Sequence, residues 1–298
     1  MLRADQQKIM KNSNSILAAI AIASGMIILS CSGKKEEAQP VFTATTSTAP
    51  VDKNWLFETT PFFADEFSNA GKPDSTKWTY DVGGNGWGNN ELEYYTNLPT
   101  NVSVVNGNLN INARKESYNN MNYTSARLVS KGDGSMLYGR VEVSAKIPSG
   151  RGMWPGIWLL PNDYAYGSWP KSGEIDVMEN VGFDPNPVYF TIHTQLYNGA
   201  IGTQKGGNKS IPDASTTFHK YRMDWTPYAV RGYYDDGLIF IYINDGSGTA
   251  SWPFDQKFHL LMNIAVGGNW GGIKGVDDTA FPTNMQVDYV HFYKMINK

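Results

Sequence analysis

Three carboxylates lie within six consecutive residues near the middle of this 298-residue chain, in the run Glu174-Ile175-Asp176-Val177-Met178-Glu179. Carboxylates this close repel one another when ionised, so at least one should keep its proton near neutral pH. A protonated carboxyl beside an ionised one can act in general acid–base catalysis, and cleavage of a glycosidic bond requires such a pair. Charge and spacing alone also allow an exposed acidic strand or a metal site.

The residues around these acids favour a strand rather than a helix, because valine and isoleucine separate the acids and Gly173 and several prolines flank them. On a regular strand Glu174 and Asp176 share one face, whereas Glu179 points to the other. Both glutamates can meet one substrate only if the strand gains a residue. A β-bulge supplies that residue, and bulges are frequent beside active sites. The spacing therefore predicts a bulge between Glu174 and Glu179.

The run 173–179 resembles the signature of glycoside hydrolase family 16 in its β-bulge form. Other segments resemble the laminarinase branch of that family in the same order: 87–96 (WGNNELEYYT), 152–158 (GMWPGIW), 169–170 (WP), 265–272 (AVGGNWGG) and 287–293 (VDYVHFY). The likeness extends from about residue 54 to 295. It implies an all-β fold, a two-sheet jelly-roll sandwich with a substrate groove across its concave sheet. It also implies a retaining endo-hydrolase of β-1,3-glucan that needs no cofactor for catalysis.

The resemblance implies a role for each acid. Glu174 is the nucleophile that forms a glycosyl-enzyme intermediate, and Glu179 is the general acid that later serves as the base. Asp176 hydrogen-bonds to Glu174 and shapes the two pKa values. His193 lies beside the acids if its strand pairs with theirs, and there it would contact substrate or an acid. We expect the other histidines to be structural: His219, His259 and His291.

Four tryptophans are expected to line the groove, because an indole stacks on the apolar face of a sugar ring. They lie close to glycines and prolines: Trp154, Trp158, Trp169 and Trp270. Trp154 and Trp158 are four residues apart in a strand-like run, so alternation places them on the same face. Packing in the core is the alternative for all four. Matching motif positions imply that Asn90 and Arg127 contact sugar hydroxyls.

The resemblance also implies a structural calcium ion on the convex side of the sandwich. The ligands would be the carboxylate of Asp288 and backbone oxygens near Glu66 and Gly107. Calcium accepts such mixed sets of oxygen atoms. The alternative for Asp288 is an ordinary acid at a turn or a strand end.

Alternation of apolar and polar residues predicts many short strands after Phe57. Clear cases are 102–113, which Asn106-Gly107 interrupts as a hairpin turn, 139–147, 238–243 after a turn at Asp236-Gly237, and 285–293. In the last segment Val287, Tyr289 and His291 are expected to share one face. Short strands without alternating helices are typical of a β-sandwich or jelly roll.

The N-terminal region resembles that of a bacterial lipoprotein. Residues 15–30 form an uncharged, mostly apolar run after Lys8 and Lys11, as in a signal peptide. The run ends in a sequence similar to a lipoprotein cleavage box, and Cys31, the one cysteine of the chain, would become the acylated first residue. We therefore expect a signal peptide over 1–30, a flexible tether over 31–53 and a catalytic domain over 54–298. The protein would be exported and lipid-anchored to the outer membrane, with the cell surface as a further option.

Composition excludes several other classes of function. The net charge of −3 gives no strong attraction to nucleic acid. The sequence has no phosphate-binding glycine loop, no Cys/His metal cluster and no serine nucleophile elbow.

We expect a monomer that acts on β-glucan. A mixed-linkage β-1,3-1,4-glucanase, an agarase-type galactan hydrolase, a transglycosylase and a non-catalytic surface glycan-binding protein stay open as alternatives.

Overall fold

The computed structural model describes residues 49–296, so the predicted signal peptide, Cys31 and most of the predicted tether lie outside the described residues. Within this range the chain forms mainly strands, and its helical elements are two short 3-10 helices, η1 (Gly199–Ile201) and η2 (Asp278–Ala280). No helix between residues 49 and 296 is long and apolar enough to cross a membrane. The predicted all-β class is confirmed.

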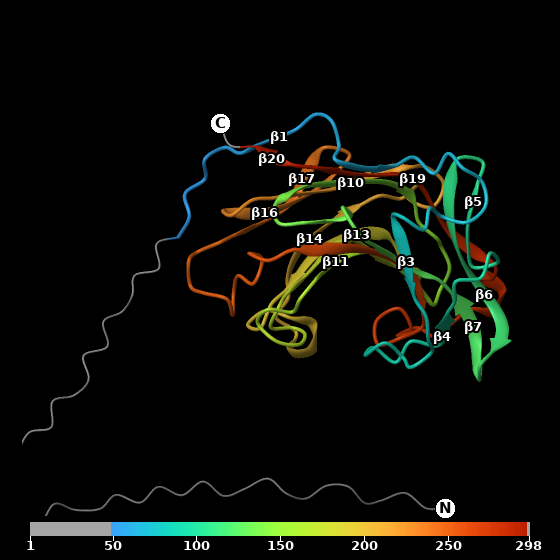
Figure 1. Cartoon of the computed structure of the whole chain (residues 1–298). Coiled ribbons are helices and arrows are strands. Elements are labelled where there is room, and N and C mark those ends of the chain that lie inside the picture. The colour runs from blue at the N-terminus through green and yellow to red at the C-terminus, as the bar shows by residue number, and fades with distance from the viewer. Residues whose placement is uncertain (1–48, 297–298) are drawn as a thin grey trace, which may run out of the picture. The chain divides into compact units, whose positions relative to one another are not determined.

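Two large sheets form the layers of a sandwich (Figure 1). The ten-stranded sheet has the order β17 (Gly237–Ile243), β16 (Ala229–Tyr234), β15 (His219–Trp225), β10 (Gly139–Lys146), β19 (Thr283–Tyr293), β6 (Asn108–Tyr118), β7 (Met121–Ser125) and β4 (Glu93–Tyr95). Two further strands belong to this sheet: β2 (Phe63–Asp65) pairs with β19, and β5 (Val102–Val105) pairs with β6. The eight-stranded sheet has the order β14 (Lys205–Ser210), β13 (Asp184–His193), β12 (Glu174–Val181), β11 (Met153–Pro161), β18 (Phe258–Val266), β8 (Arg127–Ser130) and β3 (Trp78–Asp81), with β9 (Ser135–Met136) paired to β18.

A third, two-stranded sheet joins the two ends of the described chain, where β1 (Leu56–Phe57) pairs with β20 (Met295–Ile296). Asp52 accepts a hydrogen bond from Arg231 of β16 at 2.8 Å. This contact with the domain lies inside the segment that the sequence assigned to the tether.

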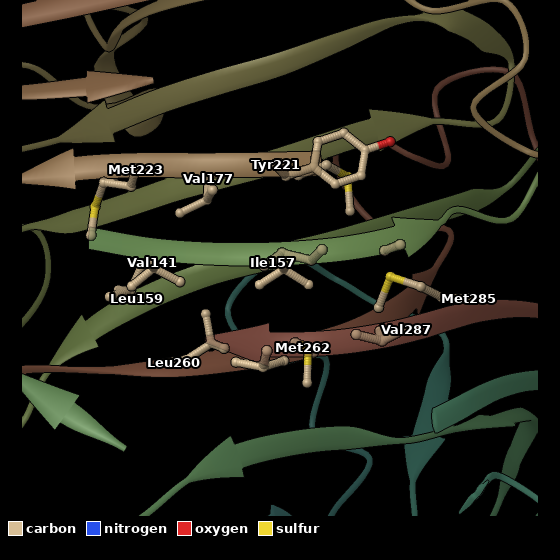
Figure 2. Close-up of a cluster of buried hydrophobic side chains, with 14 of the residues drawn as sticks. Val141, Ile157, Leu159, Val177, Tyr221, Met223, Leu260, Met262, Met285 and Val287 are labelled. Atoms are coloured by element: carbon tan, nitrogen blue, oxygen red, sulfur yellow. The ribbon is translucent and has the colours of Figure 1, made fainter. Parts of the chain in front are cut away.

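The hydrophobic core lies between the two large sheets. Figure 2 shows Val141 and Met223 of the ten-stranded sheet among Ile157, Leu159 and Val177 of the eight-stranded sheet. All five side chains are fully buried. Burial of each such side chain contributes about 1.5–3 kcal/mol, so alternation along the strands fixes which face of each sheet turns inward.

Tight turns join the hairpins close to where the sequence predicts them. Asn106 and Gly107 have left-handed φ values of 53° and 75° and connect β5 to β6, as two-residue hairpin turns require. The second turn lies one residue earlier than predicted. Asp235 and Asp236 adopt φ values of 49° and 64°, and Gly237 is already the first residue of β17.

The face predicted for 285–293 is wrong in its second half. β19 contains a bulge opposite β10, with Asp288 as the extra residue. The extra residue shifts the alternation, so Val287 and Val290 are both buried in the core. Tyr289 and His291 instead stack on each other outside the core, with ring centroids 4.3 Å apart. The sequence of this strand alternates in either register, and only its pairing with β10 reveals the bulge.

Candidate active site

A β-bulge in β12 brings the three acids to one face of the eight-stranded sheet. Glu174, Asp176 and Glu179 pair with residues 193, 191 and 189 of β13, so three steps on β12 match two steps on β13 between the last two pairs. Residues 189, 191 and 193 share one face because they alternate regularly, and their partners share that face with them. The bulge that the sequence predicts is present.

Val177 is the extra residue of this bulge. On β11, Trp158 pairs with Asp176 and Ile157 pairs with Met178, which passes over Val177. Val177 and Met178 are both fully buried in the core. Two consecutive residues of β12 therefore face the core, and this returns Glu179 to the outer face.

An open hollow of about 350 Å³ lies over the acids on this outer face. Residues from four segments line it: Asn89, Glu91, Trp154, Gly156, Trp158, Glu174, Asp176, Glu179, Asn263 and Ala265. Gly156 pairs with Glu179 on one side and with Asn263 on the other. A Cβ at Gly156 would lie 3.2 Å from Asn263 Oδ1, so glycine keeps the floor open there.

Burial is the first cause of the high pKa values of the acids. It raises the pKa of Glu174 to about 8, and the charge of Asp176 adds to this. Burial raises the pKa of Glu179 to about 7, against the neighbouring His193 and the indole N–H of Trp154, which lower it. Burial and the charge of Glu179 hold the pKa of Asp176 well above its usual range. Repulsion between the acids, the cause that the sequence suggested, comes second to burial.

His193 faces the acids from the neighbouring strand β13. Its Nδ1 accepts the backbone N–H of Gly199 at 3.1 Å, so a neutral ring carries its proton on Nε2. This Nε2 lies 3.1 Å from Asp176 Oδ2. Trp169 lies beside His193, with ring centroids 6.0 Å apart, and is 40% exposed. The strand pairing on which the prediction for His193 depended is therefore present.

Trp154 lines the hollow beside Glu179, and two further aromatic rings pack in sequence against it. Trp154 Nε1 donates a hydrogen bond to Glu179 Oε1 at 3.0 Å. The Trp154 ring packs edge to face on Trp270, with centroids 5.7 Å apart, and Trp270 packs in the same way on Tyr189 at 5.2 Å. Trp154 and Trp158 both line the hollow, as alternation along β11 predicts.

A chain of hydrogen bonds orients Trp158. Its Nε1 donates to Asn263 Oδ1 at 2.7 Å, and Asn263 Nδ2 donates to the Tyr95 hydroxyl at 2.9 Å. That hydroxyl donates to Glu91 Oε2 at 2.9 Å. Glu93 next to it is fully buried, and burial followed by the charge of Glu91 holds its pKa well above the usual range. Glu91, which itself lines the hollow, therefore anchors the indole of Trp158 through Tyr95 and Asn263.

Arg127 supports Trp158 from the side. Its guanidinium lies 4.7 Å from the Trp158 ring centroid and 4.8 Å from that of Trp87, so it is placed between two indoles. Its Nε is 3.0 Å from Asp81. Arg127 forms an ion pair with Asp81 and packs against the Trp158 ring. It is not among the residues that line the hollow.

Asn90 likewise lies next to the hollow and not in its lining. It donates to Asn269 Oδ1 at 2.8 Å and so ties together the two loops that follow β3 and β18. The lining instead includes Asn89, Glu91 and Asn263, which the sequence motifs did not predict as site residues. Asn263 had a signal, because it is a polar residue inside the apolar strand 258–266.

The remaining predicted residues lie elsewhere. The three other histidines contact polar side chains outside the lining: His219 contacts Asp235, His259 contacts Asn162 and His291 contacts Glu66. Asp288 lies on β19 between the stretch paired with β6 and the stretch paired with β2.

Two carboxyl groups with pKa values raised toward neutrality share one face of an open hollow with indole rings, which is the equipment of a glycoside hydrolase. The fold around them is a two-sheet β-sandwich of the kind that carries its site on one outer sheet face. The chain belongs to the glycosyl hydrolases family 16, whose profile matches residues 89–291.

Similar proteins agree with this assignment. The chain is 52% identical to a beta-glucanase of Rhodothermus marinus over 242 residues, which cover 78% of this chain and 85% of the relative. The X-ray structure of the laminarinase from Rhodothermus marinus has a TM-score of 0.79 and 50% identity, covering 81% of this chain and 99% of that one. A non-specific endo-β-1,3(4)-glucanase of the family, co-crystallized with 1,3-β-D-cellotriosyl-glucose, has a TM-score of 0.76 and 42% identity, covering 83% and 96%.

Proposed function

We propose that this protein hydrolyses internal β-1,3 linkages of laminarin-type glucan with retention of configuration at the anomeric carbon. The observation that carries the proposal is the bulge at Val177, which places Glu174 and Glu179 on one face of the hollow. Retaining enzymes use two carboxyl groups on opposite sides of the scissile bond, one as nucleophile and one as acid.

The first half of the reaction breaks the glycosidic bond. Ionised Glu174 attacks the anomeric carbon, while Glu179 gives its proton to the leaving oxygen. The raised pKa of Glu179, about 7, keeps that proton available near neutral pH. The products are a free sugar end and a glycosyl ester on Glu174.

The second half releases the enzyme. Glu179 has lost its proton and now takes one from a water molecule, which attacks the same carbon and displaces Glu174. Burial holds the pKa of Asp176 well above its usual range, so a neutral Asp176 can donate its proton to Glu174 in a hydrogen bond. His193 faces Asp176 from the other side at 3.1 Å. His193 lowers the pKa of Glu174 against burial and so favours the negative charge that attack requires.

The choice of β-1,3-glucan rests on the similar proteins of high identity, a beta-glucanase and a laminarinase. A second candidate is a mixed-linkage β-1,3-1,4-glucanase, because one similar structure is of a non-specific endo-β-1,3(4)-glucanase. A pure glycan-binding protein is disfavoured on physical grounds. Burying two or three like-charged carboxyls costs stability, and binding a neutral glycan does not require them.

Parallel assays on laminarin, lichenan, agarose and carrageenan test the proposal. We expect endo-type oligosaccharides from laminarin, with the β-anomer as the first product in proton NMR. Glu174→Gln is the control and should abolish turnover while leaving binding of laminarin oligosaccharides. Fast cleavage of lichenan with little cleavage of laminarin would favour the mixed-linkage activity, and an α-anomer as first product would contradict the double displacement.

We also propose a calcium ion at Asp288. The residues present fit such an ion, because the bulge turns the Asp288 carboxylate outward, where pairing passes from β6 near Gly107 to β2 near Glu66. Two backbone segments and one carboxylate thereby meet, which is an oxygen-rich donor set. A chelator should lower the melting temperature and added calcium should restore it. Asp288→Asn should remove most of that calcium dependence.

We further propose that Cys31 carries a lipid anchor that holds the domain at the outer membrane. The support is the sequence alone, namely the apolar run 15–30 followed by a cleavage-box sequence. Fractionation of cells that express the full chain tests this proposal. The enzyme should sediment with membranes and gain the mass of acyl chains on its N-terminal peptide. The same domain without residues 1–48 should be soluble and monomeric.

A further inference from the structure

The bulge that defines the active site leaves Val177 without a pairing partner on either neighbouring strand. Val177 is skipped in the pairing of β12 with β11 and also in its pairing with β13. Its carbonyl lies under the acids in the core, away from water. An unsatisfied carbonyl there would favour any rearrangement of β12 that reaches a partner, including loss of the bulge.

A side chain from the opposite sheet satisfies this carbonyl. The Tyr234 hydroxyl, at the end of β16, donates a hydrogen bond to Val177 O at 3.1 Å. Tyr234 is fully buried, and burial holds the pKa of its phenol well above the usual range, so the hydroxyl keeps its proton and stays a donor. The bond crosses the core between the two sheets.

The same region of β16 fits the strand opposite the bulge. Phe190 of β13 lies between the residues that pair with Asp176 and Glu179. Gly232, two residues before Tyr234, faces Phe190, and a Cβ at residue 232 would collide with its ring. The end of β16 therefore fits the bulged form of β12 in two ways. Gly232 leaves room for the Phe190 ring, and the Tyr234 hydroxyl donates a hydrogen bond to the Val177 carbonyl.

We propose that Tyr234 is a positioning residue for the catalytic acids: its hydroxyl fixes the bulge at Val177 from the opposite sheet and thereby sets the spacing of Glu174 and Glu179. The two acids are on opposite sides of the bulge, so a change in its backbone moves one relative to the other. Tyr234 itself touches no substrate, because it lies in the core beneath the sheet. This inference rests on the proposed function of the two acids.

The chain provides a matched control. Tyr221 of β15 pairs with Tyr234 and packs edge to face on it, with ring centroids 5.2 Å apart. It is also fully buried, and Figure 2 shows it in the same core as Val177. Its hydroxyl has no hydrogen-bond partner among residues 49–296. Tyr221→Phe therefore removes a buried hydroxyl from the same cluster without touching the bulge.

The experiment compares Tyr234→Phe and Tyr221→Phe in the full chain. We expect Tyr234→Phe to lower kcat on laminarin about tenfold, which corresponds to about 1.4 kcal/mol, with KM within about twofold of the original protein. Tyr221→Phe should leave both constants unchanged. Hydrogen exchange, followed by mass spectrometry, should become faster in the peptide 174–181 of Tyr234→Phe alone.

Several results would overturn the inference. They are an unchanged kcat in Tyr234→Phe, an equal loss in Tyr221→Phe, or a rise of KM without a fall of kcat. A Tyr234→Phe protein that does not fold would also count against it, because the hydroxyl would then hold the whole domain and not the spacing of the acids. An original protein without activity on any β-glucan would refute the proposed function, and the hydrogen-exchange comparison would still test the link from Tyr234 to the bulge.

Discussion

The hydrogen bond from Trp154 to Glu179 allows the pH dependence of the enzyme to be shifted by one substitution. Trp154→Phe keeps an aromatic ring against Trp270 but removes the N–H that Glu179 Oε1 accepts at 3.0 Å. This bond favours the ionised carboxylate and lowers the pKa of Glu179, whereas burial, the larger cause, raises it to about 7. Without this hydrogen bond the indole no longer lowers the pKa of Glu179, so burial raises that pKa further.

The size of the shift follows from the strength of the lost bond. A hydrogen bond to a charged group contributes about 1.5–3 kcal/mol, and one to the neutral acid about 0.5–1.5 kcal/mol. The difference is on the order of 1–1.5 kcal/mol, and one pKa unit equals about 1.4 kcal/mol. We therefore expect the pKa of Glu179 to rise by about one unit. Because the general acid must be protonated, activity should persist to higher pH.

The assay is kcat/KM on laminarin measured from pH 5 to pH 10, since this ratio reports the ionisations of the free enzyme. The alkaline limb should move up by about one unit in Trp154→Phe. Trp270→Phe is the matched control, because it changes the neighbouring ring but leaves the bond to Glu179, and its limb should not move. An unmoved limb in Trp154→Phe would refute the assignment of that limb to Glu179.

Three further predictions follow from the same site and from the N-terminal sequence. Glu174→Gln should raise the melting temperature above that of the original protein, and the difference should grow as the pH rises from about 4.5 to about 8. Over this range the Glu174 carboxyl, with its raised pKa, keeps a proton in the folded protein that it has lost in the unfolded chain, so folding of the original protein becomes less favourable. An equal difference in melting temperature at all pH values would contradict this. Trp158→Ala should weaken binding of laminarin oligosaccharides by roughly 2–10-fold in calorimetry on a Glu174→Gln background, from loss of about 0.5–1.5 kcal/mol of stacking, and an unchanged affinity with a large fall in melting temperature would place this indole in the core. Cys31→Ala should move the enzyme from the membrane fraction to the soluble fraction, because each acyl CH₂ contributes about 0.8 kcal/mol to anchoring; continued sedimentation would refute the lipid anchor.

The sequence alone determined the chemistry and the plan of the fold. Two glutamates five residues apart in a β-prone run can share a face only with an added residue, so the bulge in β12 followed from spacing. Alternation likewise placed Trp154 and Trp158 on one face and predicted the strand β10. These features are local, because the period of a strand is fixed by the geometry of the chain itself.

The tertiary structure decided what depends on the pairing of distant segments. The bulge at Asp288 reversed the faces of Tyr289 and His291, because an added residue shows only against a partner strand. The chain from Glu91 through Tyr95 to Asn263 and Trp158 joins segments that are far apart in sequence.

The same holds for the Tyr234 hydroxyl, which reaches Val177 across the core from the other sheet. The pKa values of the acids also depend on tertiary structure, since burial is their largest cause and burial depends on every strand around the hollow. Spacing along one strand can name the acids. Only the packed sheets determine how strongly each acid holds its proton.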